Sequence, residues 1–168
     1  MKSTLLVKEK TAGKERLKVV LKGFRAGLLA QQLGDPERGT TAYHVCIYDA
    51  SEDLAGALTV DRAGGICGSR TCWRALGIRG WKYRDAAASS DGVQRLVAKS
   101  GANNARLIVS ARNHSKKGLT SMPTGIAAAL TGSGRATVRV LTSDADCFGA
   151  TLSRVRKNTG DVFKAVGR

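Results

Sequence analysis

Three segments of the chain alternate apolar and polar side chains with a period of two, the pattern of a β-strand that buries one face. Their apolar positions are Leu17, Val19 and Leu21, then Leu107, Val109 and Ala111, then Ala136, Val138 and Val140. The intervening positions include Lys18, Lys22, Arg106 and Arg139, which favour solvent. We therefore expect strands over 17–22, 106–111 and 136–141.

Seven further segments predict strands from their apolar content and their flanking turn residues. They are Thr4–Glu9, Thr41–Asp49, Leu54–Asp61, Gly80–Asp85, Val93–Lys99, Phe148–Val155 and Asp161–Val166. Gly, Asn, Asp and Pro residues separate them, and the chain has 20 glycines. This punctuation indicates an all-β fold, an antiparallel β-sandwich or jelly-roll-like domain of about 8–10 short strands. A chain of 168 residues fits a single domain, 1–168.

Helix is expected in at most one or two short segments. The best windows are Phe24–Leu33, which ends at Gly34-Asp35-Pro36, and Cys72–Leu76. The stretch from Asn113 to Thr124 predicts a mobile, exposed loop.

Charge adds a candidate partner. The chain has 28 Lys and Arg residues against 13 Asp and Glu, a formal net charge of +15, and a pI near 10.3. Such a surplus attracts polyanions, although a solvated basic surface that only keeps the protein soluble is the alternative. The cations are spread along the chain, and aromatic residues make up only 5%. This composition favours charge-driven binding over base stacking. The predicted polyanion-binding residues come from the short basic clusters: Lys116, Lys117, Arg154, Arg156 and Lys157.

The four cysteines allow three disulfide pairings. Cys67 and Cys72 are separated by four residues that include Gly and Ser, so a local loop-closing disulfide is expected. Cys46 and Cys147 then remain as a second pair that would join distant strands. The alternatives are a zinc site that includes Cys67 and Cys72, or buried reduced thiols. Two disulfides would indicate an oxidising compartment.

Four segments carry a family resemblance: Thr59–Gly64, Cys72–Gly77, Gly80–Asp85 and Cys147–Thr151. The chain, from about Leu5 to Lys164, resembles an uncharacterised family of cysteine-containing β-domains that occurs in predicted exported proteins of environmental bacteria. The resemblance implies an exported setting and brings no activity with it. The first residues of the chain depart from that setting, because they lack the apolar run of a signal peptide.

No catalytic motif is recognisable: a G-x-S-x-G elbow, a P-loop, H-E-x-x-H and an EF-hand loop are all missing from the sequence. His44 and His114, the two histidines, are expected to be a sheet residue and a solvated loop residue. Carboxylates cluster at Asp49, Glu52 and Asp53 and at Asp144 and Asp146. They are expected to organise turns, with a calcium site or a glycosidase pair as the alternatives. No enzyme activity, cofactor or metal is predicted.

Three aromatic residues lie close together in the sequence: Trp73, Trp81 and Tyr83. Core aromatics beside the Cys67–Cys72 loop are the expected reading, and a carbohydrate-binding surface on an exposed strand is the alternative.

The leading expectation is therefore a non-enzymatic extracellular or cell-surface domain, structural or adhesive, that binds an acidic polymer or anionic surface. Association with itself through exposed edge strands is the other expected means of adhesion. The alternatives are a nucleic-acid-binding or coat-like jelly-roll protein, and a carbohydrate-binding module or polysaccharide hydrolase. No apolar run reaches the roughly 18 residues of a membrane span, and reduced cysteines would indicate the cytoplasm instead.

Overall fold

Two antiparallel sheets form a β-sandwich, as seen in a computed structural model that describes residues 3–24 and 27–167. The larger sheet has eight strands in the order β13 (Arg154–Thr159), β14 (Val162–Gly167), β1 (Ser3–Lys8), β2 (Arg16–Lys22), β10 (Arg106–Arg112), β9 (Val93–Lys99), β8 (Gly80–Arg84) and β7 (Trp73–Ala75). The smaller sheet has four, in the order β12 (Cys147–Leu152), β11 (Ala136–Thr142), β3 (Tyr43–Tyr48) and β4 (Leu54–Val60). The all-β expectation is confirmed.

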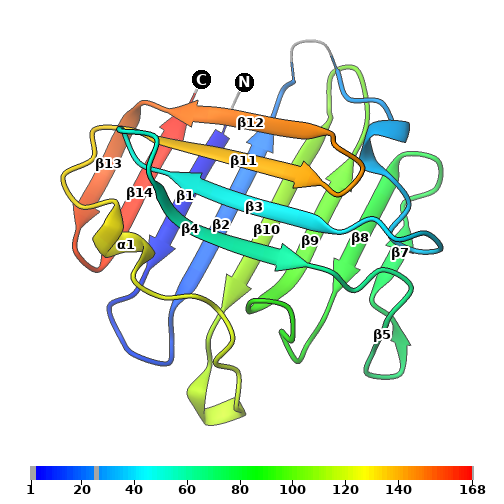
Figure 1. The fold of residues 1–168 in the computed structure, drawn as a ribbon, viewed down its shortest axis with the longest axis horizontal. Helices are drawn as coiled ribbons and strands as arrows, with labels where there is room; N and C mark the ends of the chain where they lie inside the picture. The colour runs from blue at the N-terminus through cyan, green and yellow to red at the C-terminus, as the bar shows by residue number, and fades with distance from the viewer. Residues whose placement is uncertain (1–2, 25–26, 168) are drawn as a thin grey trace.

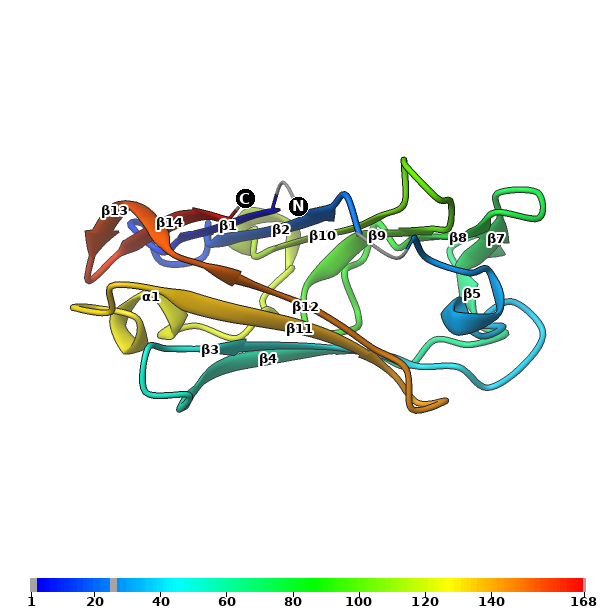
Figure 2. The same cartoon turned by 90° about the horizontal axis from the view of Figure 1, so that it is seen from above.

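The two sheets face each other as layers, and their strands cross at a steep angle (Figures 1 and 2). The smaller sheet covers only part of the larger one. Toward β8 and β7, the 3₁₀ turn at 31–33 and a small hairpin, β5 (Ile66–Cys67) with β6 (Arg70–Thr71), occupy the inner side. The short helix α1 (Ile126–Ala129) closes the opposite end.

Alternation produces the core. In β2, Leu17, Val19 and Leu21 are buried, whereas Arg16, Lys18 and Lys22 are exposed. The same division holds along β1 and β10, because successive side chains of a strand point to opposite faces. The inward side chains of both sheets form one cluster of buried residues. Their removal from water is the main force that holds the layers together.

Three large aromatic side chains pack together in the core. Trp73 lies between Tyr43 and Tyr83, with ring centroids 5.1 Å apart in both pairs. All three side chains are at most 1% exposed. The indole N–H of Trp81 donates to the carbonyl of Gly34 at 2.7 Å, so the loop after β2 is attached to the larger sheet.

The ten expected strands are present, and the structure divides some regions more finely. The segment 148–155 was expected to be one strand, but the chain passes from β12 in the smaller sheet to β13 in the larger sheet at Ser153. The window Cys72–Leu76 is strand β7 rather than helix, because Trp73 and Ala75 pair with Tyr83 and Trp81. Within Phe24–Leu33, the described residues form only the 3₁₀ turn η1 (Gln31–Leu33), and Arg25 and Ala26 lie outside the described residues.

The segment Asn113–Thr124 is only partly exposed. It contains the 3₁₀ turn η2 (Ser115–Lys117), and its ends are held together by Asn113. The side-chain amide of this residue is buried, donates to the carbonyl of Met122 and accepts from its N–H. The expected exposed loop is therefore present between these ends, at Ser115–Gly118 above all, whereas Asn113 and Met122 are buried.

The cysteines form one disulfide. Cys67 and Cys72 are bonded, as the short spacing predicted, and neither is available as a zinc ligand. Cys46 and Cys147 are free thiols, so the expected second bridge is not formed. The reason is topological: β11 lies between β3 and β12, which places the two backbones about 9–10 Å apart across the strands. A disulfide needs a Cα separation below about 7 Å.

Removing the Cys67–Cys72 bond tests its share of the stability. Replacing both residues by Ser should lower the free energy of unfolding by about 2 kcal/mol, the loop-closure entropy of so short a loop. Urea denaturation of the oxidised protein measures the change.

The matched control is Cys46→Ser with Cys147→Ser, for which we expect a change within about 0.5 kcal/mol. An equal loss in both variants, or an intact mass that reveals no alkylatable thiol, would contradict the pairing described above.

Candidate polyanion interface

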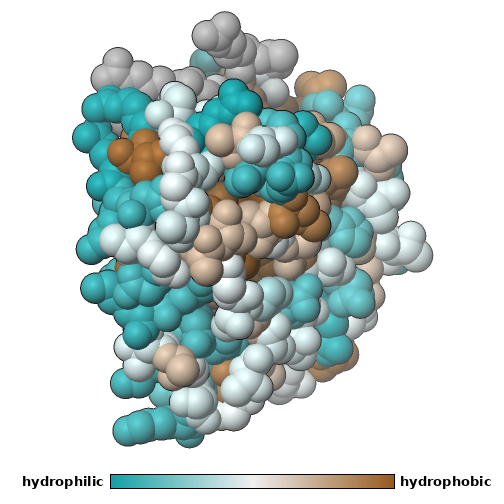
Figure 3. Space-filling model, turned by 60° about the vertical axis from the view of Figure 1, so that its left-hand side comes forward, coloured by the Kyte–Doolittle hydropathy of each residue, from teal (hydrophilic) through white to brown (hydrophobic). Residues whose placement is uncertain are grey.

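The eight strands of the larger sheet carry fifteen of the 28 Lys and Arg residues and none of the 13 acidic residues. These cations are Lys8, Arg16, Lys18, Lys22, Arg74, Lys82, Arg84, Arg95, Lys99, Arg106, Arg112, Arg154, Arg156, Lys157 and Lys164. All fifteen are exposed or half-buried. We call this outward side of the eight-stranded sheet the basic face. In Figure 3, hydrophilic residues gather along the left side of the view, toward the larger sheet.

Strand register stacks these cations in rows across the sheet. Lys99, Arg106 and Lys22 stand directly opposite one another on β9, β10 and β2. A second row at the other end of the strands joins Arg112 and Arg16 to Lys8 on β1. Like charges directly opposite each other on neighbouring strands are destabilising. The basic face therefore carries an uncompensated electrostatic cost.

The charge is left unpaired because the acids are used elsewhere. Every acidic residue lies in a turn or loop, outside the strands of both sheets. Six of their carboxylates accept hydrogen bonds from backbone N–H groups: Glu9, Glu15, Asp35, Asp49, Asp85 and Asp91. Among the described residues, the two salt bridges both belong to Glu52, which pairs with Arg135 and Arg139 away from the basic face.

The pKa values of two lysines reflect the crowding of cations on the basic face. The pKa of Lys82 is lowered, first by the neighbouring guanidinium of Arg84 and then by partial burial, Arg95 and Arg74. The pKa of Lys99 is lowered by partial burial and by Arg79 and Arg106. Both shifts have the sign expected where cations face other cations without a counter-ion.

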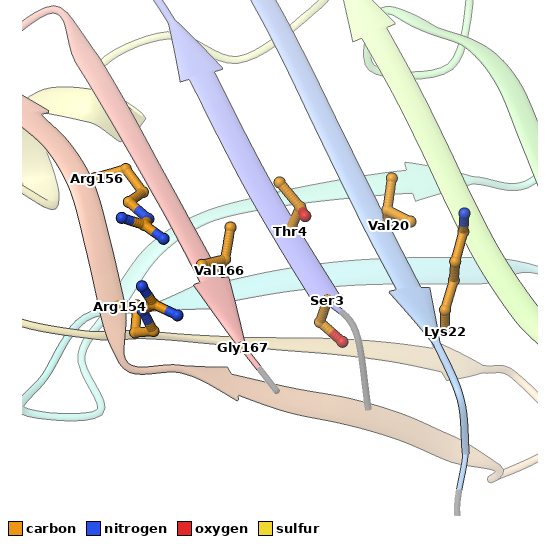
Figure 4. Close-up of a pocket in the computed structure, with 8 residues that line it drawn as sticks. All are labelled: Ser3, Thr4, Val20, Lys22, Arg154, Arg156, Val166 and Gly167. Carbon is orange, nitrogen blue, oxygen red and sulfur yellow. The ribbon is translucent and has the colours of Figure 1, made fainter.

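Hollows lie on the basic face where small side chains separate long cationic ones. One with Val20 and Val166 in its lining has a volume of about 360 Å³ and crosses β13, β14, β1 and β2. Arg154 and Arg156 extend over one side of it, Lys22 stands on the other, and Thr4 and Val20 lie between them (Figure 4). A neighbouring hollow beyond Lys22 is bordered by Arg106 and by Asn103 and Asn104.

The predicted polyanion-binding residues fall on or beside this face. Arg154, Arg156 and Lys157 form its β13 edge. Lys117 lines a hollow with Arg84, Arg95 and Arg112, and Lys116 is exposed next to it on η2. That cations within different strands share one face of the sheet was not predicted from the sequence. The alternating pattern could have indicated this, because Lys18 and Lys22 occupy the outward positions of a strand whose leucines are buried.

The aromatic strip considered for carbohydrate binding is not at the surface. Trp73 and Tyr83 are fully buried, and Trp81 packs against the core. Their strand parity directs them inward, because Lys82 and Arg84 take the outward positions of β8. Burial raises the pKa of Tyr83 to about 12, as expected for a core phenol.

The carboxylate clusters organise loops. Asp49 accepts from the N–H groups of Ser51 and Asp53, and Asp144 accepts from the hydroxyl of Thr41. Burial alone would raise the pKa of Asp85, but hydrogen bonds from Ser89 and Ala87 outweigh it and hold this pKa below its usual range. In residues 3–24 and 27–167, no three His, Cys, Asp or Glu side chains are placed to share a metal ion.

The histidines occupy ordinary structural positions. The ring Nδ1 of His44 is 3.1 Å from the hydroxyl of Thr59 on the neighbouring strand. The backbone of His114 bridges to Leu119 within the loop after β10. Neither side chain is hydrogen-bonded to a carboxylate among the described residues.

No family model matches the chain, and the comparisons with curated proteins and with solved structures gave no match. None of the helices in the described part of the chain has the length and apolarity needed to cross a bilayer.

Neutralising the middle of a cationic row should stabilise the free protein. Arg106→Gln removes two like-charge contacts, so we expect the free energy of unfolding to rise by about 0.5 kcal/mol in low salt. Urea denaturation at low salt and in about 1 M salt, where the Debye length is about 3 Å, measures the effect and its screening.

Arg139→Gln on the smaller sheet is the control with the opposite sign. Arg139 is 3.4 Å from Glu52 and lies over the ring of Tyr48, 5.0 Å from its centroid. Its loss should lower the free energy of unfolding by about 0.5 kcal/mol or less, because the pair is half exposed. A stability loss of the same size in both variants would show that the basic face is not under self-repulsion.

Proposed function

We propose that this protein is a non-catalytic binding domain for an acidic polymer, and that the basic face of the eight-stranded sheet is its binding surface. The observation that carries the proposal is the presence of fifteen cations in eight strands without one acidic residue among them. A polyanion laid on this face would replace repulsion between cations by attraction, and would release its own counter-ions.

The shape of the face supports a polymer rather than a small ligand. The five hollows described on the molecule all have basic residues in their walls, and all lie on this face or at its border. Small-molecule sites are usually enclosed and mostly apolar. Shallow hollows that follow one another over a sheet suit an extended chain that makes many weak, charge-assisted contacts.

Recognition by base stacking is not supported. The aromatic residues of the eight strands are Trp73, Trp81, Tyr83 and Phe163, and all four pack into the core. Single-stranded nucleic acids are held largely by stacking on aromatic side chains. The basic face is instead suited to the anionic groups of a polymer backbone.

Self-assembly through sheet edges has less support. Edge β13 carries a bulge and three cations, and edge β7 has only three residues. At edge β4, Ile126 of α1 packs closely against Gly56. These are common ways in which proteins prevent edge-to-edge pairing. We therefore place the adhesive function on the basic face.

An extracellular setting accompanies this proposal. Its support is the disulfide between Cys67 and Cys72, because such bonds persist in oxidising compartments. Acidic polymers are also common at cell surfaces and in extracellular matrices.

Salt-dependent binding to heparin, as a general polyanion probe, tests the function. The wild-type protein should bind at low salt and be released as salt rises. Lys22→Gln with Arg106→Gln should weaken binding about tenfold. Each lost charge-assisted contact is expected to cost about 0.7 kcal/mol of binding free energy, and two such losses correspond to a tenfold change in affinity.

The matched control removes the same charge elsewhere: Arg38→Gln with Arg70→Gln, two exposed residues outside both large sheets. Its affinity should stay within about twofold of wild type. Equal weakening in both double variants would mean that only the net charge of the protein matters and that the basic face is not the binding surface. The absence of binding to heparin, polygalacturonate and DNA at low salt would refute the function.

A further inference from the structure

Three of the hollows on the basic face join into one trough. The first is bordered by Arg84, Arg95, Lys117, Gln94 and Arg112. The second shares Gln94 and Arg112 with the first, and the third shares Arg16 with the second and ends at Lys8, Lys10 and Lys14. Their volumes are about 370, 300 and 210 Å³. The trough therefore runs across the strands from β8 to the β1–β2 hairpin.

The sequence explains why the sheet is hollow along this line. Ser110 is a small outward residue that stands directly between Arg95 of β9 and Lys18 of β2. The pairing of β10 with β9 is also irregular at Ser110/Ala111, and such irregularities bend a strand locally. Leu6, which points outward from β1, gives the middle of the trough an apolar floor.

We infer that the acidic polymer is a polysaccharide with one carboxylate per sugar, lying in this trough across the strands with about one sugar for each strand. The inference rests on the proposed function and names its ligand. Neighbouring strands place the cations of a row about 4.7–4.9 Å apart. A pyranose residue in an extended 1,4-linked chain advances by a similar distance, so successive carboxylates meet successive strands.

The lining of the trough also matches sugar rings. Arg112, Arg16 and Lys8 form a continuous cationic row along it. Gln94 and Ser110 offer neutral hydrogen-bonding groups for hydroxyls, and the apolar floor suits the C–H faces of the rings. Asp85 is the only acid in the lining, and its carboxylate is buried under hydrogen bonds from Ser89 and Ala87.

Duplex nucleic acid fits this trough less well. A duplex carries one charge per about 1.7 Å of its axis, which is much denser than one cation for each strand. Its phosphates would gain no favourable contact from an apolar floor. Binding of duplex DNA is therefore an outcome of the test rather than part of the inference.

Oligogalacturonates of defined length test the inference by calorimetric titration. Affinity should rise with each added sugar and level off at about five, because the trough crosses the five strands β8, β9, β10, β2 and β1. Methyl-esterified oligomers of the same length, which have no charge, should bind at least tenfold more weakly.

Two double variants on the same face, with the same change of charge, locate the site. Arg16→Gln with Arg112→Gln removes the centre of the trough and should weaken binding of the pentamer at least tenfold. Lys22→Gln with Arg106→Gln lies outside the trough, so it should weaken binding of the pentamer less than threefold, although the same variant weakens binding of heparin, a longer chain that spreads over the whole basic face, about tenfold. Circular dichroism and thermal melts confirm that both variants are folded.

Each result has a distinct meaning. Equal weakening in the two variants, or affinity that keeps rising well beyond five sugars, would overturn the trough while leaving polyanion binding by the face intact. Tighter binding of a duplex DNA of equal charge would overturn the sugar assignment. If neither heparin nor any oligomer binds at low salt, the proposed function fails with it.

Discussion

The burial of alternating side chains between two sheets is the constraint on which the rest of this structure depends. Once Leu17, Val19 and Leu21 face the smaller sheet, Arg16, Lys18 and Lys22 have only the outside available to them. The same rule acts on every strand of the larger sheet. The basic face is thus a direct consequence of core formation, since no separate device is needed to collect its charges.

The positions of the acidic residues explain why the basic face has no counter-charges of its own. Carboxylates on the loops of this chain accept hydrogen bonds from backbone N–H groups, as Glu9 does from the start of α1 and Asp91 does from Thr59 of β4. These roles keep the acids away from the sheet surfaces. The charge of the larger sheet therefore reflects two separate uses, because acidic residues shape the loops while fifteen of the 28 cations lie on its strands. A surface evolved only for solubility would mix both signs.

Period-two alternation was sufficient to predict the fold class and most strands, because that signal is local. Strand order is not local, and it decided the features that the sequence left open. Cys46 and Cys147 both lie in predicted strands, yet an intervening strand keeps them apart. Trp73 was placed in a helical window because its partner strand lies several residues further along the chain. The spread of cations along the sequence likewise concealed the rows that register creates.

The stability of the free protein and the binding of a polyanion are linked by these rows. Cross-strand neighbours such as Lys99 and Arg106 repel each other in the free protein, and the packed core beneath them has to offset that cost. An anionic chain laid over the row turns the same contacts into favourable ones, so the repulsion present before binding is relieved after it. A sheet that served only as a scaffold would gain stability by losing these charges one at a time. Their presence at directly opposed positions is the strongest physical reason to propose this face as a binding surface.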